Sequence, residues 1–210
     1  MNTAFISVTL LTTITGLSWA AEAPRIDILG GAAFTETYIT LGLSAPDAEA
    51  HTSGQDFSAL QIGLSAYSIS GYSSRPGKDF GGLFGAGLLV KTWAANDHNV
   101  NWTAAAPYIV LAGGGYWDPV KHLRLALLAE VGPGVAFERV SYQGNSESSW
   151  FRPVLHAGVQ ATGLVRVRSD LDVGLIGSYD YDRLPRVTAS GPLVGLIVRW
   201  NVGAPGKPGE

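Results

Sequence analysis

The sequence predicts an all-β fold, an eight-stranded antiparallel up-and-down β-barrel that spans a membrane. Three observations predict it: a composition rich in glycine and poor in charge, eight segments of alternating polarity, and connections that alternate between long and short. Of the 210 residues, 46% are hydrophobic and only 15% are charged, whereas soluble domains contain about 25% charged residues. Glycine supplies 27 residues and cysteine none, which excludes a disulfide scaffold and a thiolate metal site.

Composition and charge exclude two further classes of protein. The chain is too apolar and too poor in charge to be intrinsically disordered. Its net charge of −3, with no basic run, argues against a nucleic-acid partner. The mean hydropathy of +0.17 is compatible with a barrel in water or in lipid, so the patterning along the segments has to decide between them.

The first residues have the features of a cleaved export signal. They contain no charged side chain up to Ala20, and residues 5–17 form an apolar run of the length of a signal h-region. Ser18 and Ala20 are small residues at the −3 and −1 positions of a cleavage site after Ala20, and cleavage after Ala23 is the alternative. The predicted organisation is a signal peptide over 1–20, a barrel over 21–202 and a Pro/Gly-rich tail over 203–210.

Eight apolar-rich segments follow, separated by polar stretches with glycine, proline, asparagine or aspartate. None of them approaches the run of about 18 apolar residues that a membrane-spanning helix needs. In the first segment the alternation slips near Thr35, which predicts a β-bulge. The predicted strands are 26–44, 57–70, 79–93, 102–117, 121–138, 150–168, 171–182 and 187–202.

The connections between these segments alternate in length. Short turns on one side and longer loops on the other are typical of a barrel that spans an outer membrane. Two connections fit less well, because the one around 72–77 is long for a turn and the one at 183–186 is short for an outer loop. The long loops are 45–55, 94–101 and 139–149, and the short turns are 117–120 and 169–170.

Two-residue alternation is clearest in the fifth, sixth and seventh segments. In the fifth, Leu123, Leu125 and Leu127 share one face, whereas Arg124 and Glu130 lie on the other. Lipid-facing and lumen-facing side chains must alternate in this way along each strand of a membrane barrel. Segments this long exceed the 5–6 residues of an ordinary globular strand and suit tilted strands that cross a bilayer.

A soluble barrel with an apolar interior is the alternative interpretation of this alternation. The polar faces, however, combine glycine with both signs of charge, which suits a narrow, packed and salt-bridged lumen. The tryptophans that follow the signal lie near segment ends, where an amphipathic ring meets the headgroups of a bilayer. The predicted membrane-interface residues are Trp93, Trp102, Trp117, Trp150, Phe151, Tyr179, Tyr181 and Trp200.

The final strand resembles the C-terminal assembly signal of bacterial outer-membrane barrels. Gly195 lies five residues before the terminal aromatic Trp200, and Val198 occupies an alternating apolar position. With the export signal and the eight segments, the chain resembles small outer-membrane barrels of the outer-membrane protein A or X transmembrane type. The resemblance implies a monomer in the bacterial outer membrane, inserted by the assembly machinery, with outer-membrane lipid and lipopolysaccharide as partners.

The lumen of an eight-stranded barrel is only wide enough to be filled by side chains, so charges inside it must pair. If the hairpin at 169–170 closes with Leu171 in the loop, Arg168 faces Asp172 and Gln160 faces Asp180. We interpret the network as a structural plug of ion pairs, and a narrow ion path is the alternative. The predicted lumen residues are Lys91, Arg124, Glu130, His156, Gln160, Arg166, Arg168, Asp172, Asp180 and Arg199.

No catalytic residue, metal site or cofactor is predicted. The four histidines lie in outer loops, near a turn or in the lumen, without the nucleophile and base that acyl-transfer chemistry needs. Asp97, His98 and Asp118 lack the companions of a metal site. We expect a non-enzymatic protein with a structural or surface-interaction role. The alternatives are a narrow ion channel, a lipid A-modifying enzyme and a soluble periplasmic ligand-binding barrel.

Overall fold

The computed structural model describes residues 32–51, 54–73, 80–97, 100–120, 122–142, 145–168 and 170–201. The predicted signal peptide with its two cleavage sites, and the tail over 203–210, lie outside the described residues. Within the described ranges, no helix is long and apolar enough to cross a membrane.

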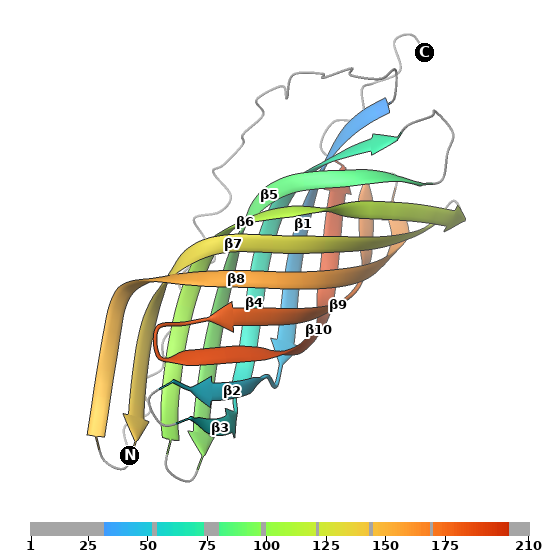
Figure 1. Cartoon of the computed structure of the whole chain (residues 1–210). Coiled ribbons are helices and arrows are strands. Elements are labelled where there is room, and N and C mark those ends of the chain that lie inside the picture. Colours follow the sequence, from blue (N-terminus) through green and yellow to red (C-terminus); the bar gives the residue numbers. More distant parts are fainter. Residues whose placement is uncertain are drawn as a thin grey trace, which may run out of the picture.

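Ten strands form one antiparallel sheet that closes on itself (Figure 1). Their order is β1-β4-β5-β6-β7-β8-β9-β10-β2-β3, and a further pairing of β1 with β10 completes the ring. The strands are β1 (Ala32–Ser44), β2 (Asp47–Ala50), β3 (Gln55–Ser58), β4 (Leu60–Ser73), β5 (Phe80–Asp97), β6 (Val100–Val120), β7 (Leu123–Tyr142), β8 (Asn145–Arg168), β9 (Leu171–Arg183) and β10 (Val187–Asn201).

The short strands β2 and β3 are continuations of β1 and β4. Ser44 of β1 pairs with Leu193 of β10, and after a break at Pro46 the same partner strand pairs Ser190 with Asp47 of β2. The Ala59 amide donates to the Pro46 carbonyl at 3.1 Å, which joins the two interrupted strands. If each interrupted strand is counted once, the barrel wall has eight strands, as predicted. Most of the predicted loop over 45–55, however, is a β-hairpin.

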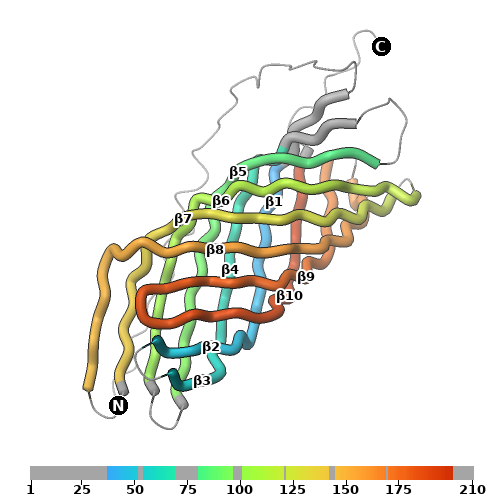
Figure 2. Tube along the Cα trace, in the orientation of Figure 1, coloured from blue at the N-terminus to red at the C-terminus, as the bar shows by residue number. Residues whose placement is uncertain are grey.

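Several strands extend beyond the predicted bounds. We call the end with the β5–β6, β7–β8 and β9–β10 hairpins the outer end, and the opposite end the inner end. β6, β7 and β8 run past the β9–β10 turn at the outer end (Figure 2). The reason is that polar residues such as Asn101 and Ser141 keep pairing after the apolar alternation has stopped. The bulge predicted near Thr35 is absent, because β1 pairs with β4 in one continuous register.

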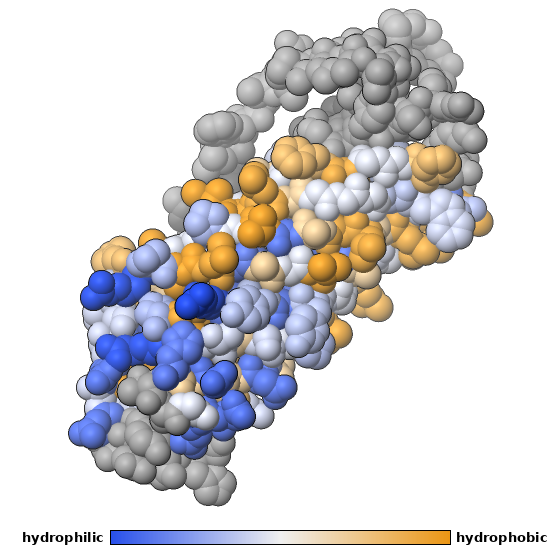
Figure 3. Space-filling view, in the orientation of Figure 1, coloured by the Kyte–Doolittle hydropathy of each residue, from blue (hydrophilic) through white to orange (hydrophobic). Residues whose placement is uncertain are grey.

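The wall of the barrel is apolar outside and polar inside. Large apolar residues such as Leu88, Ile109 and Leu175 are more than half exposed, whereas Lys91 and His156 are 1% and 0% exposed. Figure 3 shows hydrophobic residues over the wall towards the upper right and hydrophilic ones gathered at the lower left, where the outer hairpins lie. A water-soluble barrel has the reverse polarity, so this is the fold of a membrane barrel.

Candidate functional site in the barrel lumen

Five ionisable side chains from four strands meet inside the barrel, and we call them the central cluster. They are Lys91 of β5, Glu130 of β7, His156 of β8, and Asp180 and Asp182 of β9, all of them buried. The strand register brings them together, because His156 pairs with Asp182 while Gly158 pairs with both Glu130 and Asp180. Inward-facing side chains on neighbouring strands at one height must then touch.

Every member of the central cluster has an oppositely charged neighbour. The Lys91 ammonium lies 2.7 Å from Asp180 Oδ2 and 2.8 Å from Asp182 Oδ2. The His156 ring lies between two carboxylates, with Nδ1 2.9 Å from Asp182 Oδ1 and Nε2 3.1 Å from Glu130 Oε1. His156 Nδ1 also lies 3.2 Å from Lys91 Nζ, so the ring contacts the lysine as well as the two carboxylates.

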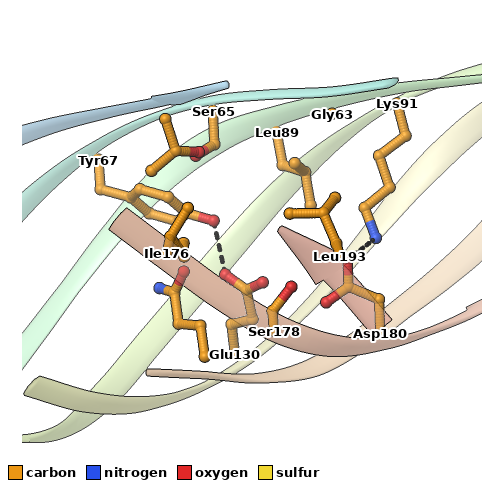
Figure 4. A pocket seen from close by; sticks show the side chains of 12 residues that line it. Gly63, Ser65, Tyr67, Leu89, Lys91, Glu130, Ile176, Ser178, Asp180 and Leu193 are labelled. Atoms are coloured by element: carbon orange, nitrogen blue, oxygen red, sulfur yellow. Dashed lines mark hydrogen bonds and ion pairs between the residues drawn. The ribbon is translucent and has the colours of Figure 1, made fainter. Parts of the chain in front are cut away.

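Tyr67 and Gly158 shape the space around these charges. The Tyr67 hydroxyl donates to Glu130 Oε2 at 2.5 Å, as the dashed line in Figure 4 shows. A Cβ atom on Gly158 would lie 3.0 Å from Asp180 Oδ1 and 3.2 Å from Glu130 Oε1. Glycine therefore leaves room for the two carboxylates to converge. Among the described residues, Asp180 Oδ1 has no hydrogen-bond partner.

A small cavity of about 20 Å³ adjoins the cluster (Figure 4), which is roughly the room that one water molecule needs. The polar residues that line this cavity carry charged, hydroxyl or amide groups. These residues include Tyr67, Lys91, Glu130, Gln160, Ser178 and Asp180.

A second group of charges lies at the inner end of the lumen. Asp172 forms an ion pair with the buried Arg199 and a longer one, at 3.5 Å, with Arg166. Nearby, Arg124 donates to both carboxylate oxygens of Asp118 at 2.7 Å and lies over the Tyr116 ring. We call these residues the inner cluster.

Buried apolar side chains lie between the two clusters along four strands, and we call these side chains the apolar layer. Leu128 lies between Glu130 and Arg124 on β7, and Ile176 lies between Asp180 and Asp172 on β9. Leu164 and Ile197 each stand two positions before an arginine of the inner cluster, on β8 and β10, and all four apolar side chains are buried. The buried polar residues Gln160 and Thr162 lie in the same stretch of β8.

The register at the β8–β9 turn differs from the predicted one by two residues. Arg166, not Arg168, pairs with Asp172, and Gln160 pairs with Ser178 rather than with Asp180. One residue of the difference arises because Leu171 pairs with Arg168 instead of lying in the loop, and the second arises from a register shift between Arg166 and Arg168. The Arg168 side chain is 69% exposed and pairs with Asp170, so it lies outside the lumen, and Arg166 is half-buried at the inner end.

Two of the predicted membrane-interface residues point into the lumen instead. Trp93 and Trp102 are 2% and 0% exposed, and their rings stack with centroids 6.0 Å apart. Their indole nitrogens donate to Gln61 and Glu138. The prediction for this pair is wrong because the strands continue beyond these positions. Six predicted residues do face outwards: Trp117, Trp150, Phe151, Tyr179, Tyr181 and Trp200.

The β9–β10 turn is held in place by neighbouring elements near the outer end. Leu184 of the turn is buried, and the Arg186 amide donates to Glu138 Oε2 at 3.1 Å. The His51 amide donates to the Arg186 carbonyl at 2.8 Å, and His51 Nε2 lies 2.8 Å from Thr188 Oγ1. These contacts hold the turn against β7 and against the residue that follows β2.

Glu138 lies beyond the apolar belt, since it pairs with Ser149 on the outer side of Trp150. Burial raises the pKa of its carboxyl to about 7, although hydrogen bonds from the Trp102 indole and the Arg186 amide act in the opposite direction. Its protonation state therefore changes near neutral pH.

Sequence reasoning missed three members of this lumen network. Asp182 has the same parity as Asp180 but stands at the end of its predicted segment, and this parity was the signal that could have found it. Tyr67 belongs to the predicted segment 57–70, which contains no charged residue to mark its lumen-facing side. Glu138 closes the predicted fifth segment, and only the strand register shows that it meets Trp102 and Arg186.

No protein-family model and no curated protein matches the sequence. Among solved structures, the chain is similar to Ail, the attachment invasion locus protein of Yersinia pestis, with 14% identity over 79% of this chain and 97% of that one, and a TM-score of 0.45. It is similar to Neisserial surface protein A, with 14% identity, 82% and 99% coverage and a TM-score of 0.46. It is also similar to the outer membrane protease OmpT of Escherichia coli, with 6% identity, 83% and 98% coverage and a TM-score of 0.44. The fold, fixed by the register and polarity described above, is that of an eight-stranded outer-membrane β-barrel.

Proposed function

We propose that this chain is a monomeric structural protein of the bacterial outer membrane, with a lumen closed by ion pairs and an outer end that contacts the membrane surface. The observation that carries the proposal is the polarity of the closed ring. Apolar side chains such as Leu127, Val159 and Leu196 face outwards, and the buried charges are paired inside. Lipid solvates the first group, and ion pairing offsets the desolvation of the second.

The apolar layer favours a closed lumen over an ion path. An ion that left the central cluster towards the inner end would pass the buried side chains of Leu128, Leu164 and Ile176, with Gln160 and Thr162 as neutral polar groups beside them. Moving an ion past apolar side chains with few polar partners is unfavourable. The ion pairs of the central and inner clusters therefore connect strands to one another and do not form a path for ion conduction.

The outer end supports a contact with lipopolysaccharide. Arg152 directly follows the outward-facing Trp150 and Phe151, Arg183 pairs with Leu155 further along the same strand, and both arginines are exposed. Aromatic rings mark the headgroup level of a membrane barrel, and guanidinium groups bind phosphate well. Lipid phosphates at this height are the partner that these arginines fit.

A non-enzymatic role is part of the proposal. The buried His156 and Asp182 have the geometry of a base and its orienting acid, but the ring is 0% exposed and the lumen beside it has room for about one water molecule. His51 is exposed, but its ring nitrogens contact Pro185 O and Thr188 Oγ1 rather than a carboxylate. A lipid substrate has no route to the buried ring of His156.

Fractionation and gel electrophoresis test the proposal together. We expect the protein in the outer-membrane fraction, with a folded, unboiled form that migrates differently from the boiled form. The replacement Trp200→Ala, at the end of the predicted assembly signal formed by Gly195, Val198 and Trp200, should lower the folded fraction in cells. Recovery of the protein from the soluble periplasm, without a heat-dependent shift, would refute the membrane assignment.

A further inference from the structure

We propose that the central cluster is a binding site for one divalent transition-metal ion of the zinc class, with Glu130, His156 and Asp180 as ligands. The site does not depend on the proposed structural role, because a barrel of any function could hold it. One atom from each of the three buried residues, a carboxylate oxygen or a ring nitrogen, lies within 4.8 Å of the others.

The ligand atoms are chemically suited to zinc. Zinc accepts imidazole nitrogen and carboxylate oxygen at about 2.0–2.2 Å, and its sites often combine three protein ligands with one water. His156 Nε2 and Glu130 Oε1 are 3.1 Å apart, close to the spacing of two ligands on one tetrahedral ion. Small side-chain rotations would bring Asp180 Oδ1 to the same centre.

Each ligand residue is held through its other polar atom. Asp182 Oδ1 accepts from His156 Nδ1 at 2.9 Å, Tyr67 donates to Glu130 Oε2 at 2.5 Å, and Lys91 donates to Asp180 Oδ2 at 2.7 Å. Supporting contacts of this kind orient the ligands of metal sites and fix the histidine tautomer. The three remaining atoms, Nε2, Oε1 and Oδ1, are the ones directed to the common centre.

Asp180 Oδ1 is the independent sign of a missing partner. Asp180 is 4% exposed, and within the described ranges this oxygen accepts no hydrogen bond. A buried carboxylate oxygen without a partner is unfavourable. Gly158 leaves the space beside it open, since its absent Cβ would lie 3.0 Å from Oδ1 and 3.2 Å from Glu130 Oε1.

The charge count of the cluster matches a divalent cation. Glu130, Asp180 and Asp182 carry three negative charges and Lys91 carries one positive charge, so the cluster has a charge of −2 when the imidazole of His156 is neutral. A doubly charged ion at Nε2 brings this sum to zero. In the imidazolium form, where the sum is −1, the ion replaces the Nε2 proton, which leaves to solvent, and the sum is again zero. The imidazolium alone leaves a charge of −1 in a buried site, where uncompensated charge is unfavourable.

Metal analysis of the full chain, prepared without a histidine tag, tests the site. The protein is refolded from urea into detergent with a small excess of zinc chloride, because the cluster is buried, and is then dialysed. Gel migration confirms that each sample is folded. We expect one zinc per folded chain, and with cobalt(II) in place of zinc we expect the visible absorption of a four-coordinate ion. A folded wild-type protein without stoichiometric metal would overturn the proposal.

Variants locate the metal. Asp180→Asn should abolish stoichiometric zinc, whereas Asp172→Asn, a change of another buried aspartate on the same strand, should retain it. Asp182→Asn, a positioning change, should weaken zinc binding about 10–100-fold. His51→Gln should change nothing.

The contrary outcomes are equally definite. Zinc bound equally by the wild type and by Asp180→Asn would place the metal elsewhere and refute the proposal. If Asp180→Asn does not fold, Glu130→Gln takes its place with the same expectation. If neither variant folds, the cobalt spectrum of the wild type decides, and the absence of four-coordinate absorption refutes the site.

Discussion

His156 of β8 lies directly opposite Asp182 of β9, and its Nδ1 is 2.9 Å from the Asp182 carboxylate. This pair connects two neighbouring strands and contacts Glu130 of the adjacent strand β7 and Lys91 of β5. Ion pairs therefore stabilise the interior of the barrel at this level, and apolar side chains contribute to its packing nearer the inner end. The predictions that follow test the two contributions separately.

Replacement of His156 by leucine should destabilise the barrel by about 3–5 kcal/mol, because it leaves buried carboxylates without their partner. The urea midpoint of the folded protein in detergent or liposomes measures this effect. His122→Leu is the matched control, since that histidine is exposed and its change should stay within about 0.5 kcal/mol. Equal midpoints for the two variants would show that the central cluster contributes nothing to stability.

Gly158→Ala should lower the free energy of unfolding by about 1–3 kcal/mol, the usual effect of an added methyl in a packed interior. The new Cβ would press on Asp180 Oδ1 and Glu130 Oε1. Gly177→Ala on β9 is the control, because a Cβ there meets nothing within 4 Å. A neutral Gly158→Ala variant would mean that the carboxylates do not converge over this glycine.

The pH dependence of stability should reveal Glu138. Its pKa is raised from the usual 4.5 to about 7 in the folded protein, so the folded state retains a proton that the unfolded state has already lost. The protonated Glu138 carboxyl therefore makes its full contribution to the free energy of unfolding below pH 4.5. This contribution is lost as the pH rises to about 7. Glu138→Gln should remove this part of the pH dependence in urea titrations at pH 5 and pH 8. Parallel curves for the two proteins would contradict the assignment.

Tryptophan fluorescence should separate the inward-facing and outward-facing rings. In single-tryptophan variants reconstituted with brominated lipids, Trp117 and Trp200 should be quenched, because they face outwards. Trp93 and Trp102 should be protected, since they stack inside the barrel. Strong quenching of Trp102 would restore the interface position that its sequence context predicts.

The strands and their polarity could be predicted because alternation is a local property. Leu125 and Glu130 lie on opposite faces in the sequence pattern and on opposite faces of the wall. Strand ends were harder to place, because hydrogen bonding continues at Asn101 and Ser141 after the apolar alternation ends. Trp93 and Trp102 were assigned to the membrane interface for that reason.

The heights of the lumen residues could not be predicted, because they depend on register. The pairing of Leu171 with Arg168 and the register shift after it together move the partner of Asp172 by two residues, and no composition rule shows either of them. The three proposed metal ligands come from three strands and have no local spacing motif. Parity could place Glu130, His156 and Asp180 in the lumen, but only the sheet places them at one level.

Planar-bilayer recording tests the closed, ion-paired lumen most directly. The wild-type protein, shown to be folded by its heat-dependent gel migration, should give no discrete conductance steps. The same silence is expected of Lys91→Met if that variant folds, because the apolar layer of Leu128, Leu164, Ile176 and Ile197 stays in place. Reproducible steps in the wild type that change in size with Lys91→Met would show that ions pass through the lumen, and would contradict the account.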